Sequence, residues 1–215
     1  MKKLIGLFAA LIFSAGTMAI DIKEGVHYEV INKKSSGTAK PEIKEFFSYY
    51  CPHCMTFEPL AKRLDDNAEK EGYKFVKSHV DFLRAAGPDI QVMLTKALVT
   101  SKRLNVPKVS DAIFTYIHKQ RAAITKLQDI KNMFLLNGVS SEDFEKTFNS
   151  FQVNAAAKKM KKEQDELARL RVLTGVPTFI INGKYKLLTK GFSKAKTYDE
   201  LFAQLEEAAI SLSKK

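Results

Sequence analysis

The sequence predicts an α/β domain that is interrupted by an all-helical insertion. Two β-rich segments in the first part of the chain enclose one helical segment, a long stretch of helical pattern follows, and a β-hairpin and a last helix end the 215 residues. A chain of this length suits one large domain or one domain with a big insertion. Because strand patterns return after the helical stretch, we expect the helices to interrupt a single sheet-containing domain.

The first residues are not expected to belong to the fold. Residues 1–19 open with Lys2 and Lys3, continue with an apolar run from Leu4 to Phe13 and end at the small residue Ala19. That is the pattern of a secretory signal peptide, and its apolar run is too short to span a bilayer. We therefore expect export, cleavage near Ala19 and a soluble mature protein.

The first four elements of the α/β domain are predicted to be two strands, a helix and a third strand. Residues 27–31 alternate polar and apolar side chains, as an edge strand does, and residues 42–50 are β-rich and mostly apolar, as a buried strand is. A helix is expected from Pro52, whose missing N–H is harmless in a first turn, to Lys70, and Gly72 is expected to end that segment. Residues 73–82 predict the next strand.

The helical insertion is predicted from amphipathic runs and capping signals. Ser110 is an N-cap candidate, and Thr125 with Gln128 has the spacing of a capping box before a helix that ends at Asn137-Gly138. Three further helical segments are expected at residues 89–104, 141–151 and 153–173.

The last elements are a hairpin and a helix. Residues 177–183 and 184–191 read as two strands, and Asn182-Gly183 between them is a strong hairpin-turn signal. Thr197 and Glu200 have capping-box spacing and predict the start of the C-terminal helix.

The charge balance excludes one class of function. The formal net charge is +11, and a basic protein can bind nucleic acid or anionic lipid. Here positive and negative residues are mixed along the chain, and no run of aromatic residues alternates with arginine. Nucleic-acid binding is therefore not expected, and the charges are interpreted as solvated helix faces.

Cys51 and Cys54 are the only cysteines, and they form a C-P-H-C motif. A disulfide that closes so short a loop stabilises a protein little, so a purely structural role is disfavoured. A zinc site would need a second pair of ligands with suitable spacing, and c-type haem attachment would need histidine where Met55 stands. A reactive thiol pair is the remaining interpretation, and metal binding by Cys51, Cys54 and His53 stays open as an alternative.

The position of Cys51 predicts its chemistry. It lies where a buried strand gives way to a helix N-terminus, and the unpaired N–H groups and the helix dipole there favour a thiolate. Pro52 stiffens the turn, and His53, if protonated, would add a positive charge one turn away. Cys51 is therefore predicted to be the nucleophile and Cys54, one turn into the helix, the resolving thiol. A stabilised thiolate would stabilise the reduced form and make the disulfide a better oxidant.

Glu45 is a further candidate, because a carboxylate in an apolar strand is unfavourable unless it is paired. Lys77 in the next strand could be its partner. The alternative is that Glu45 points to solvent at a sheet edge.

Three stretches carry a resemblance to a known family. They are "EFFSYYCPHC", "KSHVDF" and "GVPTFIINGKY", and their order and spacing resemble the DsbA family of periplasmic thiol:disulfide oxidoreductases across the mature chain. The resemblance implies a thioredoxin-like fold interrupted by an all-helical insertion domain. It divides the chain into thioredoxin-like segments 20–83 and 153–215 and a helical domain at 84–152. His79, in the second stretch, is interpreted as structural.

The resemblance also implies site residues. A cis peptide is expected between Val176 and Pro177, in a loop that faces the Cys51–Cys54 disulfide and offers backbone to an extended substrate. Glu45 and Lys77 would lie beneath the disulfide and influence its proton traffic.

The function expected from these features is a periplasmic dithiol oxidase without a cofactor. It would oxidise reduced, unfolded secreted proteins as a monomer, and the resemblance implies re-oxidation by a DsbB-like membrane quinone reductase. Two alternatives remain open at this point: a disulfide reductase or isomerase of the same fold, and a non-enzymatic metal carrier that uses the C-P-H-C motif.

Overall fold

The structure, a computed structural model, describes residues 21–31 and 38–215. The expected signal peptide lies outside the described residues. The strands are β1 (Tyr28–Val30), β2 (Glu42–Phe47), β3 (Lys74–His79), β4 (Thr178–Ile181) and β5 (Tyr185–Leu187). The α-helices are α1 (Pro52–Asp66), α2 (Ala68–Glu71), α3 (Pro88–Arg103), α4 (Lys108–Phe114), α5 (Leu127–Leu136), α6 (Ser141–Phe148), α7 (Phe151–Arg169) and α8 (Tyr198–Ser213). A π-helix, η1 (Thr115–Lys119), continues α4, and a 3₁₀ helix, η2 (Thr189–Phe192), follows β5.

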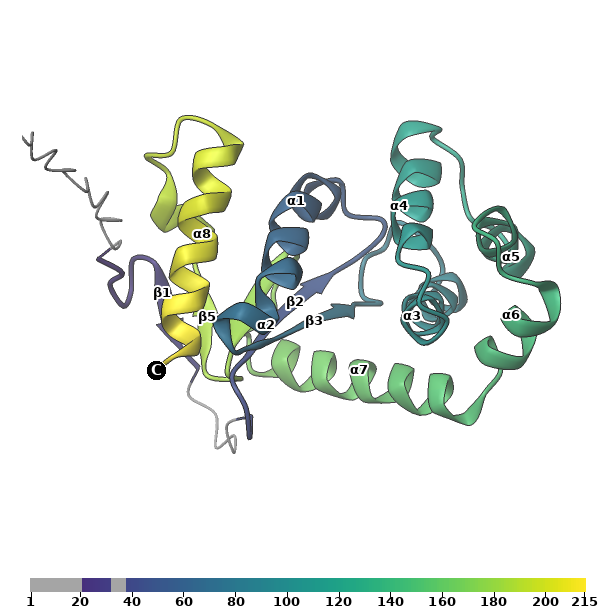
Figure 1. Cartoon of the computed structure of the whole chain (residues 1–215), viewed down its shortest axis with the longest axis horizontal. Helices are drawn as coiled ribbons and strands as arrows, with labels where there is room; N and C mark the ends of the chain where they lie inside the picture. Colours follow the sequence, from purple (N-terminus) through teal and green to yellow (C-terminus); the bar gives the residue numbers. More distant parts are fainter. Residues whose placement is uncertain (1–20, 32–37) are drawn as a thin grey trace, which may run out of the picture.

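The five strands form one mixed sheet in the order β1-β5-β4-β2-β3. Only β2 and β3 are parallel, with Glu45 opposite Lys77, while β4 runs antiparallel to both β2 and β5. The chain leaves the sheet after β3, builds α3 to α7 and returns as β4 in the middle of the sheet (Figure 1). The predicted fold class, a thioredoxin-like fold with a helical insertion, is confirmed.

Apolar clusters pack on both faces of the sheet, because successive side chains of a strand point to opposite faces. On one face, Ile43 of β2 packs in a cluster with Leu60 of α1 and Leu205 of α8. On the other face, Phe46 packs with Leu167 near the end of α7. Because neighbouring residues of a strand point to opposite faces, β2 is buried on both sides, as its nearly continuous apolar sequence predicts.

The insertion helices pack around a core of their own that reaches the cysteines. Residues from α3, α4, α5 and α6 share one apolar cluster with Phe47, Tyr49 and both cysteines. In Figure 1 these helices lie beside the sheet, and α7 runs from them back beneath it. The C-terminal end of β2 and the cysteines that follow it therefore pack against the insertion helices.

Three turn and cap predictions are confirmed. Asn182 and Gly183 both have positive φ, 53° and 65°, which the tight turn between β4 and β5 requires. The Thr197 hydroxyl accepts a hydrogen bond from the Glu200 N–H at 3.1 Å and caps α8. Gly72 also ends α2 in the left-handed conformation, with φ of 78°.

Four local predictions are wrong in detail. α4 begins two residues before Ser110, whose hydroxyl bonds the Tyr49 phenol instead of capping the helix. The Asp129 carboxylate caps α5, because it accepts hydrogen bonds from the Thr125 N–H and hydroxyl. The predicted capping box with Gln128 is therefore not formed. The first helix breaks at Asn67 instead of continuing to Lys70. The strand expected at 184–191 is only three residues long, because η2 replaces its second half.

Candidate functional site

The loop after β2 brings Cys51 to the start of α1. Cys51 is the N-cap residue, with extended backbone (φ −97°, ψ 111°), and Pro52 occupies the first turn. The Cys51 N–H donates to the Ser48 carbonyl at 3.0 Å, which closes the turn between strand and helix. A cysteine thus stands where serine, threonine or aspartate normally caps a helix, and its sulfur takes over the acceptor role.

The two thiols, both free in this structure, have different surroundings. The Cys54 N–H donates to the Cys51 sulfur at 3.1 Å, and the Cys51 thiol lies 3.5 Å from the Val176 carbonyl oxygen. Hydrogen bonds from the Cys54 side chain and from the N–H groups of Cys54 and His53 outweigh burial and lower the pKa of Cys51 to about 7. Cys54 is completely buried, and that burial together with the neighbouring Cys51 sulfur raises its pKa far above the ordinary range.

These positions agree with the expected difference in accessibility. Cys51 is 5% exposed and Cys54 0%, so Cys54 is the less accessible sulfur, as predicted. Pro52 and His53 are exposed on the first turn of α1. The contribution of His53 that the structure shows is its backbone N–H, which helps to stabilise the Cys51 thiolate.

The loop before β4 completes the surroundings of Cys51. The peptide between Val176 and Pro177 is cis, as predicted. β4 pairs with β2, and this pairing brings the Val176 carbonyl next to a sulfur that is 125 positions away in the sequence. The Cys51 sulfur therefore lies beside the half-buried loop of residues 175–177.

A buried ion cluster lies under the cysteines. Glu45 is 0% exposed, which excludes the alternative that it points to solvent. Its Oε2 lies 3.5 Å from Lys77 Nζ, so the predicted partner is confirmed, although neither Glu45 oxygen makes a hydrogen bond of good geometry. Lys77 also pairs with Glu58 of α1 and lies over the Phe47 ring, 4.3 Å from its centroid.

The cluster changes the acidity of all three groups. Burial raises the pKa of Glu45 to about 7, against the attraction of Lys77, and burial also raises the pKa of Glu58. Burial opposes the charge on Lys77, but the two carboxylates outweigh it and raise the pKa of its ammonium group. Two acids that share one cation near neutral pH can hold or release one proton under the thiols.

Glu58 is a site residue that sequence reasoning missed. It lies four residues after Cys54 on α1, so both side chains fall on the same helix face. The signal was present in the spacing, because a carboxylate one turn beyond a buried thiol faces the same interior. Its partner, Lys77, could be recognised only through the strand register.

The helical insertion holds the active-site loop through two tyrosines, which the sequence did not reveal. The buried Tyr49 hydroxyl bonds Ser110 Oγ at 2.8 Å, and His118 Nε2 donates to the Tyr49 carbonyl at 2.8 Å. The Tyr50 hydroxyl accepts from the Ile124 N–H at 3.3 Å. Because η1 adds a residue to the helical turn, it places His118 over the loop.

The described part of the chain holds neither an assembled metal site nor a helix that could span a membrane. No group of three or more histidine, cysteine, aspartate or glutamate side chains is assembled there in a way that could hold a metal ion. In residues 21–31 and 38–215, none of the helices has the length and apolar character needed to cross a membrane.

Comparison with known proteins gives one consistent result. The family model of the DSBA-like thioredoxin domain matches residues 42–205. The chain is 34% identical over 195 residues to the thiol:disulfide interchange protein DsbA of Salmonella typhimurium, with 89% of this chain and 88% of the relative covered. It is 32% identical over 219 residues to the same protein of Escherichia coli K12, with both chains covered completely.

Solved structures give the same similarity. The disulfide oxidoreductase DsbA from Proteus mirabilis superposes with a TM-score of 0.76 at 34% identity, covering 91% of this chain and 98% of that one. A cysteine-to-serine variant of the same protein, with a non-covalently bound peptide PWATCDS, also gives 0.76, at 33% identity and with 91% and 100% covered.

Proposed function

The chain belongs to the DSBA-like thioredoxin family and is a thiol:disulfide oxidoreductase, and we propose that it works as an oxidase that donates its Cys51–Cys54 disulfide. The observation that carries the proposal is the similarity to DsbA proteins along nearly the whole chain, and the lowered pKa of Cys51 agrees with it in direction. A stabilised Cys51 thiolate favours the dithiol form, and an enzyme with a favoured dithiol form gives its disulfide away.

The reaction proceeds in two exchanges. A substrate thiolate attacks Cys51 Sγ, the bond between Cys51 and Cys54 breaks, and Cys54 leaves with the electron pair. A second substrate thiolate then attacks the substrate sulfur of the mixed disulfide, and Cys51 leaves as a thiolate. Two electrons pass from the substrate dithiol to the enzyme. Attack falls on Cys51 because Cys54 is completely buried, and Cys51 is the better leaving group because its pKa is lower.

The substrate is an unfolded polypeptide in extended form. The Val176 carbonyl lies beside Cys51 in the loop that ends at the cis bond to Pro177, so a strand that pairs with this backbone brings its own cysteine to the sulfur. The peptide bound to the variant DsbA of Proteus mirabilis supports this class of substrate.

The buried cluster supplies the proton that the first exchange needs. Cys54 leaves as a thiolate with a strongly raised pKa, so it must be protonated. Glu45, whose pKa is about 7 and which is charge-coupled to Cys54, holds a proton for part of the time near neutral pH. Lys77 and Glu58 set that proton affinity.

The remaining parts of the proposal concern the setting. Residues 1–19 act as the signal peptide, the enzyme works in the periplasm as a monomer, and its clients are reduced secreted proteins. A DsbB-like membrane quinone reductase re-oxidises it. The chain divides into thioredoxin-like segments 20–83 and 153–215 and a helical domain at 84–152. The family membership supports each of these points.

The deciding experiment measures the equilibrium of the Cys51–Cys54 disulfide with a glutathione buffer. We expect a potential well above that of the glutathione couple, and oxidation of a reduced, unfolded protein that is lost in Cys51→Ser. The Cys54→Ser variant is the matched control: it cannot form the internal disulfide, and with oxidised glutathione its Cys51 thiolate should displace one glutathione thiolate and stop at the mixed disulfide. A potential near the value of about −270 mV found for thioredoxin would replace the oxidase proposal by the reductase alternative.

A further inference from the structure

The turn that leads into Cys51 is closed by its own backbone. Residues 48–51 form a β-turn, in which the Cys51 N–H donates to the Ser48 carbonyl at 3.0 Å and Tyr49 and Tyr50 take the two central positions. The peptide bond between Tyr49 and Tyr50 is therefore the central peptide of this turn. Its orientation sets the direction in which the chain enters Cys51, the N-cap residue of α1.

Both polar groups of this central peptide are hydrogen-bonded. Its N–H, which belongs to Tyr50, donates to the Ser48 hydroxyl at 3.2 Å. Its carbonyl, which belongs to Tyr49, accepts from His118 Nε2 at 2.8 Å. The first bond is local to the turn, whereas the second comes from a residue 69 positions later in the π-helix η1. The central peptide cannot rotate without breaking one of these bonds.

The Tyr49 carbonyl needs this donor. Tyr49 is 0% exposed, so water does not reach its backbone oxygen in the folded protein, and a buried carbonyl without a donor is unfavourable. Within the described residues, His118 is the donor that satisfies it. A carbonyl oxygen can only accept, so the neutral imidazole carries its proton on Nε2, and the protonated ring keeps that proton. The bond is therefore present in both protonation states of His118.

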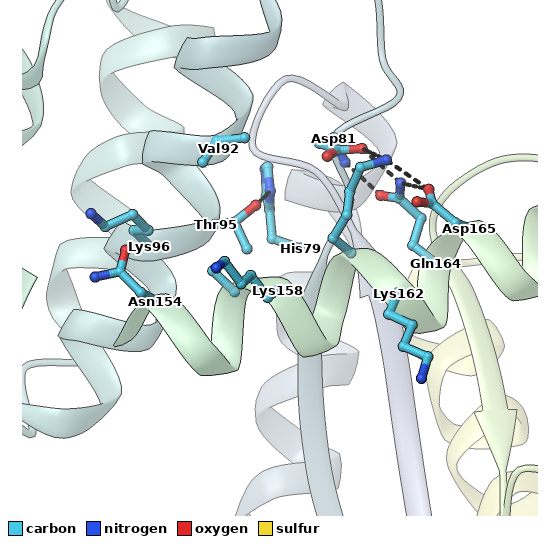
Figure 2. Close-up of a pocket in the computed structure, with 12 residues that line it drawn as sticks. His79, Asp81, Val92, Thr95, Lys96, Asn154, Lys158, Lys162, Gln164 and Asp165 are labelled. Atoms are coloured by element: carbon cyan, nitrogen blue, oxygen red, sulfur yellow. Dashed lines mark hydrogen bonds and ion pairs between the residues drawn. The ribbon is translucent and has the colours of Figure 1, made fainter. Parts of the chain in front are cut away.

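The Tyr49 side chain is fixed independently of its carbonyl. Its hydroxyl bonds Ser110 Oγ at 2.8 Å, and its ring stacks on the His79 imidazole at 5.3 Å. His79 is held in turn by Thr95, with 2.9 Å between Nδ1 and the hydroxyl oxygen, at a pocket of about 470 Å³ between α3 and α7 (Figure 2). Because the side chain cannot follow, a Tyr49 carbonyl that loses its donor can reach another only by rotation of the central peptide, which moves the residues after it.

The position of Cys51 decides how well its thiolate is stabilised. The hydrogen bonds that lower the pKa of Cys51 come from the Cys54 side chain and from the N–H groups of Cys54 and His53. The Cys54 N–H lies 3.1 Å from the sulfur, and such bonds weaken steeply when their angle departs from linearity. A small rotation before Cys51 therefore leaves the thiolate less stabilised, although Cys54 and His53 keep their places in the helix.

We propose that His118 is a positioning residue for the thiol:disulfide exchange, because its Nε2–H holds the central peptide of the turn and thereby holds Cys51 at the N-terminus of α1. It acts through the Tyr49 carbonyl and not on the sulfur itself. The proposal deepens the proposed function and rests on it for the role of Cys51 as the exchanging sulfur. It also gives the helical insertion a part in the reaction, since η1 supplies the donor.

The test compares two substitutions of His118 in the full chain. His118→Phe keeps a ring against Phe114, with which His118 stacks at 6.1 Å, but removes the donor. If the thiolate loses stabilisation equal to one ordinary hydrogen bond, the pKa of Cys51 rises by about 0.5 to 1, which thiolate absorbance against pH measures. At pH 8.5 the equilibrium with glutathione should then move roughly 3- to 8-fold toward the oxidised protein. His118→Gln, whose amide can donate from a similar reach, should restore both values.

Lys119→Gln is the matched control. Lys119 is exposed and follows His118 in η1, so its replacement should leave the pKa of Cys51 and the glutathione equilibrium unchanged. An equal change in Lys119→Gln would reduce the effect to net charge and contradict the proposal. Unfolding in urea separates position from stability: a His118→Phe protein that is less stable but keeps the parent pKa of Cys51 would overturn the proposal. A His118→Gln protein that changes as much as His118→Phe would overturn it as well.

A measurement on the parent chain keeps the proposal open to refutation if His118→Phe fails to fold. Nitrogen–proton correlation spectra of the isotope-labelled protein should place the proton of the neutral His118 ring on Nε2, and a neutral ring with its proton on Nδ1 would contradict the bond to Tyr49. The potential of the parent tests the direction of exchange, whereas the differences between parent and variants test His118. The oxidase proposal and the role of His118 can therefore fail separately.

Discussion

Cys51 and Cys54 are one helical turn apart, yet their surroundings move their pKa values in opposite directions. The sulfur of Cys51 receives hydrogen bonds from the Cys54 side chain and from backbone N–H groups, which favour its charged form. Cys54 is enclosed on all sides, and burial penalises its charged form. The pair is therefore asymmetric, although the two residue types are identical.

Replacing Cys54 tests how much of the lowered Cys51 pKa is caused by the Cys54 side chain. In Cys54→Ala the side-chain hydrogen bond to Cys51 is lost while the backbone donors remain, so the pKa of Cys51 should rise from about 7 toward its ordinary value of 9. Thiolate absorbance in the ultraviolet as a function of pH measures this directly. Thr56→Ala is the control, because its hydroxyl bonds the Pro52 carbonyl on the same turn. A Cys51 pKa that stays near 7 in Cys54→Ala would assign the whole shift to the backbone.

Glu45 predicts a pH dependence of stability. Its pKa is 4.5 ordinarily and about 7 in the folded protein, so the folded state binds more protons than the unfolded state between these values. The stabilisation is complete below pH 4.5 and is lost as the pH rises through 7, with a size on the order of 2–3 kcal/mol. Urea unfolding at pH 4.5 and 7.5 should show this fall in the parent chain and a smaller one in Glu45→Gln. The exposed Glu69→Gln should behave as the parent, and an equally steep fall in Glu45→Gln would reject the assignment.

At the scale of elements, the turn between β4 and β5 also joins two other elements. Asn182 Oδ1 accepts from the Glu42 N–H of β2 at 2.9 Å, and its amide donates to the Ser213 carbonyl at the end of α8 at 3.0 Å. One side chain thus holds a strand, a turn and a helix end together. Its positive φ of 53° adds a backbone requirement to these bonds.

Two substitutions at this turn separate the bonds from the backbone requirement. Asn182→Gly keeps the permitted backbone and loses the side-chain bonds, which should cost about 1–2 kcal/mol. Asn182→Ala also forces a Cβ into the left-handed region, which should add about 1 kcal/mol or more. Free energies of unfolding in urea for the three proteins provide the measurement. Equal losses in the two variants would show that the positive φ carries no strain.

The elements that sequence predicted well are those whose signals are local. The Asn182-Gly183 turn and the Thr197 cap depend on residues within four positions, and both are confirmed. Ser110 was misread because its hydroxyl serves a partner 61 positions away, Tyr49, and not its own helix. At Ser110 the tertiary hydrogen bond to Tyr49 therefore replaces the helix cap that the local sequence indicates.

At the scale of the whole molecule, the candidate site was predictable where the motif is contiguous and hidden where the fold assembles it. Cys51 and Cys54 come from one motif, and Glu45 was suspected because a carboxylate in an apolar strand needs a partner. The pocket at His79 could not be foreseen, because it exists only where α3 meets α7.

The redox state should change the stability of the entire fold. The Cys51 thiolate of the reduced protein has a folded pKa of about 7 against 9 ordinarily, so its stabilisation is complete above pH 9 and is lost as the pH falls through 7. The reduced form should therefore gain up to about 3 kcal/mol relative to the oxidised form between pH 6 and pH 9. Guanidinium unfolding of both forms at the two pH values measures the gap. If the free energy of unfolding of the reduced form does not rise relative to that of the oxidised form between pH 6 and pH 9, the thiolate explanation is contradicted.

The place of β4 in the sheet has a consequence for synthesis. β4 lies between β5 and β2, and the Val176 carbonyl arrives 125 positions after Cys51. At about 5–20 residues per second, translation needs roughly 6–25 s to cover that distance. During this interval β2 has β3 on one side and an open edge on the other, and the thiols lack the loop that later faces them. Under the proposed export the same order holds across the membrane, because the chain emerges from its N-terminal side, so copies that have delivered β3 but not β4 expose open edges that can pair with each other.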